Sequence, residues 1–335
     1  MSIIMPPSHC PQCKYSIPWY LNVPLVTWLV LGGRCKNCGA PISVRYFLVE
    51  LLTGLMFLCS WLKFGDPGHA LQSIPLALVY ALFLAGLMVA TFIDFDHFII
   101  PDEITFGGIA AGLLLSFLLP QLQDPTLHGQ GASLHGAGLV RSFTGAVVGA
   151  GIVYAVLRLG KLLFGRHHLK LEGQTKIVFS ETALHLPDRE IPYDELFYRK
   201  SDTIVLEAQT VELIDRGYKD VTVRLSPSLL DISGEKLEPA NVPFMECVSA
   251  EIVIPREAMG LGDVKFMSAI GAFIGWQGVI FSLMISSMIG AGVGLLLILM
   301  HRREFSSRMP YGPYIALAAV IWLFIGKKYF LQLYQ

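Results

Sequence analysis

The chain has little charge for its length. Of its 335 residues, 15% are charged and 53% are hydrophobic, and the mean hydropathy is +0.56. A typical soluble domain carries about 25% charged residues, whereas so apolar a composition is characteristic of a protein that crosses a membrane several times. The scarcity of charge therefore excludes an ordinary soluble protein.

Other features are also missing. No cluster of Lys and Arg marks a phosphate-binding face, so we expect no nucleic-acid partner. Residues 1–9 lack a charged n-region followed by an apolar h-region, so we expect no cleavable signal peptide. The chain also shows no internal repeat and no low-complexity tract.

Long apolar runs are what the chain has instead. About 20 residues are needed to span a bilayer as a helix. We predict a mainly α, polytopic helical membrane protein with about seven spans. The expected spans are residues 46–64, 71–93, 104–122, 139–164, 264–276, 279–301 and 311–330. The run at 264–276 is short, so we expect it to begin inside the preceding glycine-rich turn, or to be tilted or half-buried.

One polar stretch holds most of the charge. Residues 166–256 contain 27 of the 51 charged residues. Short β-branched runs bounded by Pro, Gly, Asp and Ser predict strands at residues 176–179, 203–206, 221–225 and 250–254. We therefore expect a small β-rich soluble insert, with a short helix near residues 193–199. The predicted divisions are residues 1–45, 46–165, 166–256 and 257–335: a zinc-binding segment, membrane helices, the insert, and further membrane helices.

The positions of Lys and Arg predict an orientation. Residues 123–138 contain neither, which places that loop outside under the positive-inside rule. The N-terminal segment, the insert and the ends of the spans near Asp94 and Asp263 are then inside. The basic residues that set this orientation are Lys14, Arg34, Lys36, Arg45, Arg158, Lys161, Arg166, Lys170, Arg302, Arg303 and Arg308.

Four of the six cysteines form two pairs. Cys10-Pro-Gln-Cys13 and Cys35-Lys-Asn-Cys38 are separated by 21 residues. Two such turns present four thiolates to one tetrahedral zinc ion, and a cytoplasmic position disfavours disulfides. We predict a structural, zinc-ribbon-like site; a redox pair or unliganded thiols are the alternatives. We expect Cys59 and Cys247 to be small packing residues.

Two aspartates lie at the ends of apolar runs. Asp94 closes one run, and Asp263 stands in Gly260-Leu261-Gly262-Asp263 just before another. An ionisable residue at membrane depth is costly, and two carboxylates can share a proton and activate water. The glycines allow the backbone to approach a partner chain closely. The alternative is that such charges only mark the ends of spans in the headgroup region, as we also expect for His97.

Several motifs in order resemble those of the type IV prepilin peptidases. The two cysteine pairs are followed by Ala40-Pro41-Ile42-Ser43-Val44-Arg45-Tyr46, Glu50-Leu51-Leu52-Thr53-Gly54, Asp94-x5-Ile100-Pro101-Asp102, Gly260-Leu261-Gly262-Asp263-Val264-Lys265, Gly271-Ala272-Phe273-Ile274-Gly275-Trp276 and Pro310-Tyr311-Gly312-Pro313-Tyr314. The resemblance covers nearly all of the chain except residues 166–250.

The resemblance implies a membrane aspartic endopeptidase of the bacterial inner membrane. It would cleave the leader peptides of type IV prepilins or pseudopilins at the cytoplasmic face of the lipid bilayer and methylate the new N-terminus with S-adenosylmethionine. It implies that Asp94 and Asp263 are catalytic. The supporting residues are Gly260, Gly262, Lys265, Asp96, Pro101, Asp102 and Glu50. Arg45 and Glu50 are candidates for the methyl-donor site, and Lys265 either stabilises negative charge or snorkels to the interface.

Two features depart from the family pattern. Members usually carry a membrane helix before the first cysteine pair. We therefore expect either that the start of this chain has been placed too far downstream or that the chain is naturally shorter. The charged insert is also outside the common pattern. The rival interpretation is a membrane transporter or channel with Asp94 and Asp263 along an ion path and a zinc-ribbon docking module. It requires polar groups deep in several spans, and the runs contain very few.

Overall fold

The structure is a computed structural model. It describes residues 8–124, 132–164, 166–187, 189–197, 202–255, 260–300, 310–327 and 329. Two compact units are present: residues 1–150 with 262–335, and residues 151–261. Arg302, Arg303 and Arg308, which contributed to the predicted orientation, lie outside the described residues.

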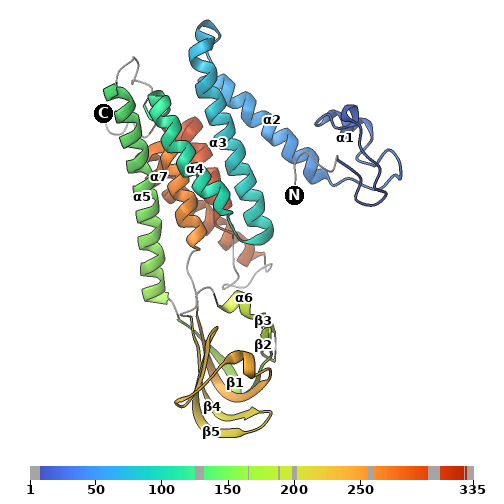
Figure 1. Ribbon diagram of the computed structural model, residues 1–335, viewed down its shortest axis with the longest axis vertical. Helices are drawn as coiled ribbons and strands as arrows, with labels where there is room; N and C mark the ends of the chain where they lie inside the picture. Colours follow the sequence, from blue (N-terminus) through green and yellow to red (C-terminus); the bar gives the residue numbers. More distant parts are fainter. Residues whose placement is uncertain are drawn as a thin grey trace. The chain divides into compact units, whose positions relative to one another are not determined.

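The described residues of the seven expected apolar runs lie mostly in helices (Figure 1). The long helices are α2 (Val44–Phe64), α3 (Ala70–His97), α4 (Asp102–Leu118), α5 (Ala132–Phe164) and α7 (Leu261–Leu299). Helix α8 (Gly312–Ile321) continues into a π-helical turn, η5 (Trp322–Gly326). The short elements are η1 (Trp19–Leu21), α1 (Val26–Val30), η2 (Pro67–His69), η3 (Pro120–Leu122) and η4 (Pro239–Asn241).

The helices at the expected spans differ in length. Among the described residues, four helices are long and apolar enough to cross a membrane: α2, α3, α5 and α7. Helix α4 has only 17 residues, and the apolar segment Gly312–Gly326 is shorter still. The expected spans at 264–276 and 279–301 are two helices that carry the single label α7 and are divided by a kink at Gly275.

Gly275 causes a kink inside α7. Its φ of 73° and ψ of 174° are not helical, and glycine adopts a positive φ at little cost. The nearby carbonyl of Ala272 accepts hydrogen bonds from Gln123 Nε2 and Ser142 Oγ, both at 2.7 Å. Such bonds satisfy a backbone oxygen that has no water partner at membrane depth.

Small residues let the helices pack closely around the first half of α7. A Cβ added to Gly145 of α5 would lie 2.1 Å from the carbonyl oxygen of Gly271, and one added to Gly149 would lie 2.5 Å from that of Met267. On α4, Gly112 approaches Ala272 in the same way. Because lipid is as apolar as a side chain, membrane helices associate by such close packing. This packing buries the part of α7 that follows Asp263.

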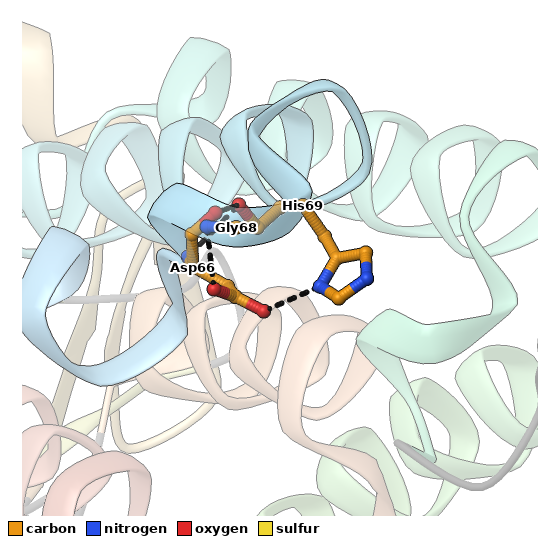
Figure 2. Close-up of polar contacts among 4 residues, drawn as sticks. Asp66, Gly68 and His69 are labelled. Carbon is orange, nitrogen blue, oxygen red and sulfur yellow. Dashed lines mark hydrogen bonds and ion pairs between the residues drawn. The ribbon is translucent and has the colours of Figure 1, made fainter.

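The carboxylate of Asp66 makes hydrogen bonds within the connection between α2 and α3 (Figure 2). Asp66 accepts from the backbone N–H of Gly68 and lies 2.9 Å from His69 Nδ1. The bond with His69, followed by that with Gly68, holds the pKa of Asp66 below its usual range. Asp66 thus fixes the start of η2 and the reversal of the chain.

The insert is an eight-stranded antiparallel sheet, as the β-branched runs predicted. Its order is β3-β2-β1-β8-β4-β5-β6-β7, with β1, β4 and β5 labelled in Figure 1. The strands are β1 (Arg166–Phe179), β2 (Ala183–His185), β3 (Glu190–Pro192), β4 (Ile204–Leu213), β5 (Gly217–Ser226), β6 (Leu229–Ile232), β7 (Glu235–Leu237) and β8 (Met245–Pro255). The expected short helix is α6 (Tyr193–Leu196); residues 198–201 are outside the described chain.

Alternating side chains form the core of the sheet. Burial alternates along β4, and its inward side chains join Ile177, Val223 and Ile252 in one apolar cluster. Cys247 is fully buried in this cluster, which confirms it as a packing residue. Cys59, expected to pack as well, is instead exposed on α2.

Candidate functional site

Asp94 lies near the C-terminal end of α3 and is only 5% exposed. Its Oδ2 atom accepts a hydrogen bond of 2.9 Å from the backbone N–H of Gly312 at the start of α8. Gly312 has no side chain, and a Cβ there would lie 2.7 Å from Asp94 Oδ2. Glycine is therefore needed at this position for the backbone to reach the carboxylate.

Asp263 lies in the first turn of α7 and is 9% exposed. The preceding Gly262 faces Ile100: a Cβ on Gly262 would be 3.6 Å from the Cβ of Ile100. A carboxylate in the first turn of a helix is favoured by the positive end of the helix dipole. Gly260 stands just before α7 and is exposed.

The link between α3 and α4 joins the surroundings of the two aspartates. Phe98 ends α3 in the left-handed region and donates its N–H to the carbonyl of Asp94. Pro101 takes the N-cap position of α4. Between them, Ile100 is buried and contacts both Gly262, beside Asp263, and Gly312, which binds Asp94. The structure thus gathers the ends of α3, α7 and α8 around one side chain.

Two ion pairs flank this link. Arg45, at the start of α2, makes a two-point contact with Asp96 at 3.0 and 2.6 Å. Lys265 of α7 lies 2.5 Å from Asp102, the first residue of α4. The nitrogen of Lys265 also lies 5.2 Å from the ring centre of Phe106. Asp96 and Asp102 are therefore partners of cations, which distinguishes them from the buried Asp94.

The four cysteines Cys10, Cys13, Cys35 and Cys38 form one cluster. Their sulfur atoms all lie within 4.8 Å of one another, with Cys10 and Cys38 3.8 Å apart and Cys13 and Cys35 3.9 Å apart. A tetrahedral zinc ion with Zn–S distances of 2.3 Å spaces its sulfurs about 3.8 Å apart. The geometry of the cluster therefore fits a zinc ion.

The two cysteine turns share a backbone conformation and a pattern of hydrogen bonds. Lys14 and Gly39, each directly after the second cysteine of a pair, both have a positive φ, of 57° and 71°. In each turn this residue donates its N–H to the carbonyl of the first cysteine at 2.9 Å. The first cysteine in turn donates to the carbonyl of Tyr15 in one pair and of Ala40 in the other.

Backbone groups of these turns also favour the thiolate form that a metal requires. A backbone hydrogen bond from Tyr15 lowers the pKa of Cys13 to about 6. Backbone hydrogen bonds from Cys38 and Asn37 lower the pKa of Cys35. Because metal ligation needs deprotonated sulfur, these bonds favour ligation at Cys13 and Cys35. At Cys38 a backbone hydrogen bond from Ala40 lowers the pKa, but contacts with the other cysteines and burial outweigh it and raise the pKa to about 11.

Glu50 connects α2 to the cysteine segment. Its Oε2 atom accepts the backbone N–H of Leu25 at 2.8 Å, and Leu25 has the unusual φ of 62°. Beside it, the rings of Trp28 and Phe47 lie 5.0 Å apart. The observed role of Glu50 is thus to hold α1 against the first turns of α2.

The sequence did not assign a role to Ile100 or Gly312. Both stand in motifs that were noted, Ile100 before Pro101 and Gly312 between two aromatic residues. The signal for Gly312 was a glycine at the start of an apolar run, as at Gly262. For Ile100 there was no signal, because an isoleucine near a span is ordinary.

Two family models match the chain. The Bacterial Peptidase A24 N-terminal domain matches residues 1–64, which include the cysteine cluster. The Type IV leader peptidase family matches residues 81–167 and 239–295, which include Asp94 and Asp263. Residues 168–238, most of the insert, lie outside both matches.

Individual relatives agree with the family models. A prepilin leader peptidase/N-methyltransferase of Aeromonas hydrophila is 28% identical over 98% of this chain and 74% of its own length. One from Myxococcus xanthus is 48% identical over 35% of this chain, a match that covers only 33% of that protein. A type 4 prepilin-like proteins leader peptide-processing enzyme of Escherichia coli is 43% identical over 35% of the chain and 41% of its own length. No solved structure matches.

Proposed function

We propose that this chain, which belongs to the type IV leader peptidase family, cleaves the leader peptides of type IV prepilins or pseudopilins at the cytoplasmic face of the bacterial inner membrane. The family is one of peptidase enzymes, and four helices of the described residues are long and apolar enough to cross a membrane. The observation that carries the proposal is the position of Asp94 and Asp263. Both are buried, and Ile100 connects their surroundings.

The proposed chemistry uses the two carboxylates as a pair. One aspartate is ionised and takes a proton from water, while the other is protonated and polarises the carbonyl of the scissile bond. The N–H of Gly312 supports this division, because it orients the carboxylate of Asp94. The burial of both groups keeps bulk water away, which strengthens their interaction with a bound peptide.

The cysteine cluster is proposed to hold one structural zinc ion through Cys10, Cys13, Cys35 and Cys38. The ion would cross-link the two cysteine turns and would stabilise the fold of the segment. We place it outside the peptidase chemistry. The name of the Aeromonas hydrophila relative includes an N-methyltransferase activity. On that basis we also propose that the chain methylates the new N-terminus, with S-adenosylmethionine as the methyl donor.

The test is to incubate the purified protein in detergent with a prepilin. We expect a product shorter by the length of the leader peptide, and transfer of a labelled methyl group when S-adenosylmethionine is added. A transporter or channel, the competing interpretation, would leave the prepilin intact. An unprocessed substrate with a folded, zinc-loaded protein would refute the peptidase proposal.

A further inference from the structure

The segment from Asp94 to Asp102 touches the starts of three other helices. Through Asp96 it contacts Arg45 at the start of α2, and through Asp94 it contacts Gly312 at the start of α8. Through Asp102 it contacts Lys265 in the first turns of α7. Five helices are therefore tied together at one end by nine residues.

Ile100 lies at the centre of this arrangement. It is 8% exposed, although its neighbour Ile99 is 61% exposed, so the chain turns Ile100 inward and Ile99 outward. A Cβ on Gly312 would be 3.2 Å from the Cδ1 atom of Ile100, and a Cβ on Gly262 would be 3.6 Å from its Cβ atom. The contact on the Gly312 side is tight, whereas a Cβ on Gly262 would make an ordinary van der Waals contact with Ile100.

The two ion pairs stand at the ends of the same segment. Arg45 holds Asp96, two residues after Asp94, and its guanidinium also lies 5.0 Å from the ring centre of Phe92. Lys265, two residues after Asp263, holds Asp102. Both pairs are partly exposed, and exposed pairs add little stability. What they fix is the position of the segment relative to α2 and α7.

We propose that Ile100 is a positioning residue that sets the separation of the Asp94 and Asp263 carboxylates. The pairs Arg45–Asp96 and Lys265–Asp102 hold the segment that carries Ile100 in place. This inference rests on the proposed function. A displacement of about 1 Å in a catalytic group can lower the rate about 100-fold. The side chains named here contact the helices that carry the aspartates and act through them.

The first test shortens and restores the side chain of Ile100. In the full-length protein, we expect Ile100→Ala to lower kcat for prepilin cleavage about 10-fold or more while KM changes less than about 2-fold, since geometry and not substrate binding is disturbed. Ile100→Leu, which keeps the volume, should recover most of kcat. A loss confined to KM, or wild-type kcat in Ile100→Ala, would overturn the proposal.

The second test is a double-mutant cycle on the ion pair between α7 and α4. Lys265→Gln and Asp102→Asn should each lower kcat, and the double variant should be no slower than the slower single variant, because either change removes the same contact. Losses that simply multiply would contradict the proposed coupling. Arg141→Gln is the matched control: it removes the ion pair between Arg141 and Asp124, outside the candidate site, and should leave kcat unchanged.

The two proposals fail in different ways. If Asp94→Asn cleaves prepilin normally, the proposed catalytic pair is wrong and Ile100 has nothing to position. If Asp94→Asn is inactive while Ile100→Ala and both ion-pair variants match the wild-type kcat, only the positioning inference is refuted. Zinc content and thermal unfolding of each variant, compared with the wild type, separate a changed site from a protein that fails to fold.

Discussion

Two aspartates only two residues apart have different environments in this protein. Asp94 is buried and accepts an N–H from Gly312, whereas Asp96 is exposed and pairs with Arg45. The reason is helix geometry: successive residues are about 100° apart around the axis, so positions i and i+2 point to nearly opposite sides. The same separation distinguishes Asp263 from Lys265 on α7.

We expect Asp94→Asn and Asp263→Asn each to abolish prepilin cleavage while the protein still inserts in the membrane. An amide can neither accept nor donate the catalytic proton, so the loss should exceed about 1,000-fold if the carboxylates perform the chemistry. The measurement is the leader-length mobility shift with equal amounts of purified variants. Near-normal cleavage by either variant contradicts the assignment.

Asp96→Asn is the matched control for this prediction, because it makes the same chemical change two residues away. It should retain measurable activity, reduced by the loss of the contact with Arg45. If it is as inactive as Asp94→Asn, the first catalytic residue has been misassigned.

At the scale of elements, the cysteine turns form a unit that is distinct from the helices. We expect one zinc ion per chain, and expect the double variant Cys10→Ser with Cys35→Ser to lose it, because each turn then keeps a single sulfur ligand. Metal analysis of purified protein is the measurement. Cys59→Ser, on the exposed face of α2, is the control and should keep the zinc.

A chelator gives the complementary observation. Removal of the zinc should loosen the N-terminal segment without stopping cleavage at once. Immediate loss of cleavage with an intact fold would indicate that the metal is catalytic.

The contact between α5 and α7 depends on glycine. We expect Gly145→Ala to lower the thermal unfolding midpoint in detergent, because its Cβ would lie 2.1 Å from the Gly271 carbonyl oxygen and the helices must separate. Overpacking of this kind costs about 1–3 kcal/mol. Gly136→Ala, on the same helix with nothing within 4 Å of the added Cβ, is the control and should not lower the midpoint. Equal midpoints for both variants would mean that the close approach is unimportant.

At the scale of the whole molecule, the insert is predicted to fold separately and to carry none of the catalytic groups. Strands β1 and β8 pair from Arg166 with Pro255 to Phe179 with Met245, so the unit to express is residues 166–255. Its apolar cluster gives it a core of its own. We expect the isolated fragment to show a β-type circular dichroism spectrum and a cooperative thermal transition. A helical or unstructured spectrum contradicts this.

The paired ends of the insert also allow its removal. Because Arg166 and Pro255 are partners across an antiparallel pair, their Cα atoms lie about 5 Å apart and a short Gly/Ser linker can join them. We expect the linker variant to keep cleavage activity, with an altered preference among substrates if the insert tunes their access. Complete loss of cleavage, with the membrane helices still folded, would mean that the insert helps to assemble the site.

The sequence by itself determined most of the helices and pointed to the candidate residues for the proposed chemistry. Apolar runs predicted the helices, because a long apolar run is excluded from water whatever it packs against. The cysteine spacing predicted the cluster. The apolar pattern also predicted two separate runs at 264–276 and 279–301, and the kink at Gly275 divides the helices there. The short strands β2, β3, β6 and β7 were also missed, because three or four residues give too little pattern to detect.

Only the tertiary structure decided which ends meet. The contact of Gly312 with Asp94, the place of Ile100 between two glycines, and the partners of Asp96 and Asp102 all join residues from different helices. No local pattern encodes such contacts, because a side chain's periodicity records whether it is buried but not what it faces. The sequence therefore identified the two aspartates, whereas the packing of the helices fixed how they are held.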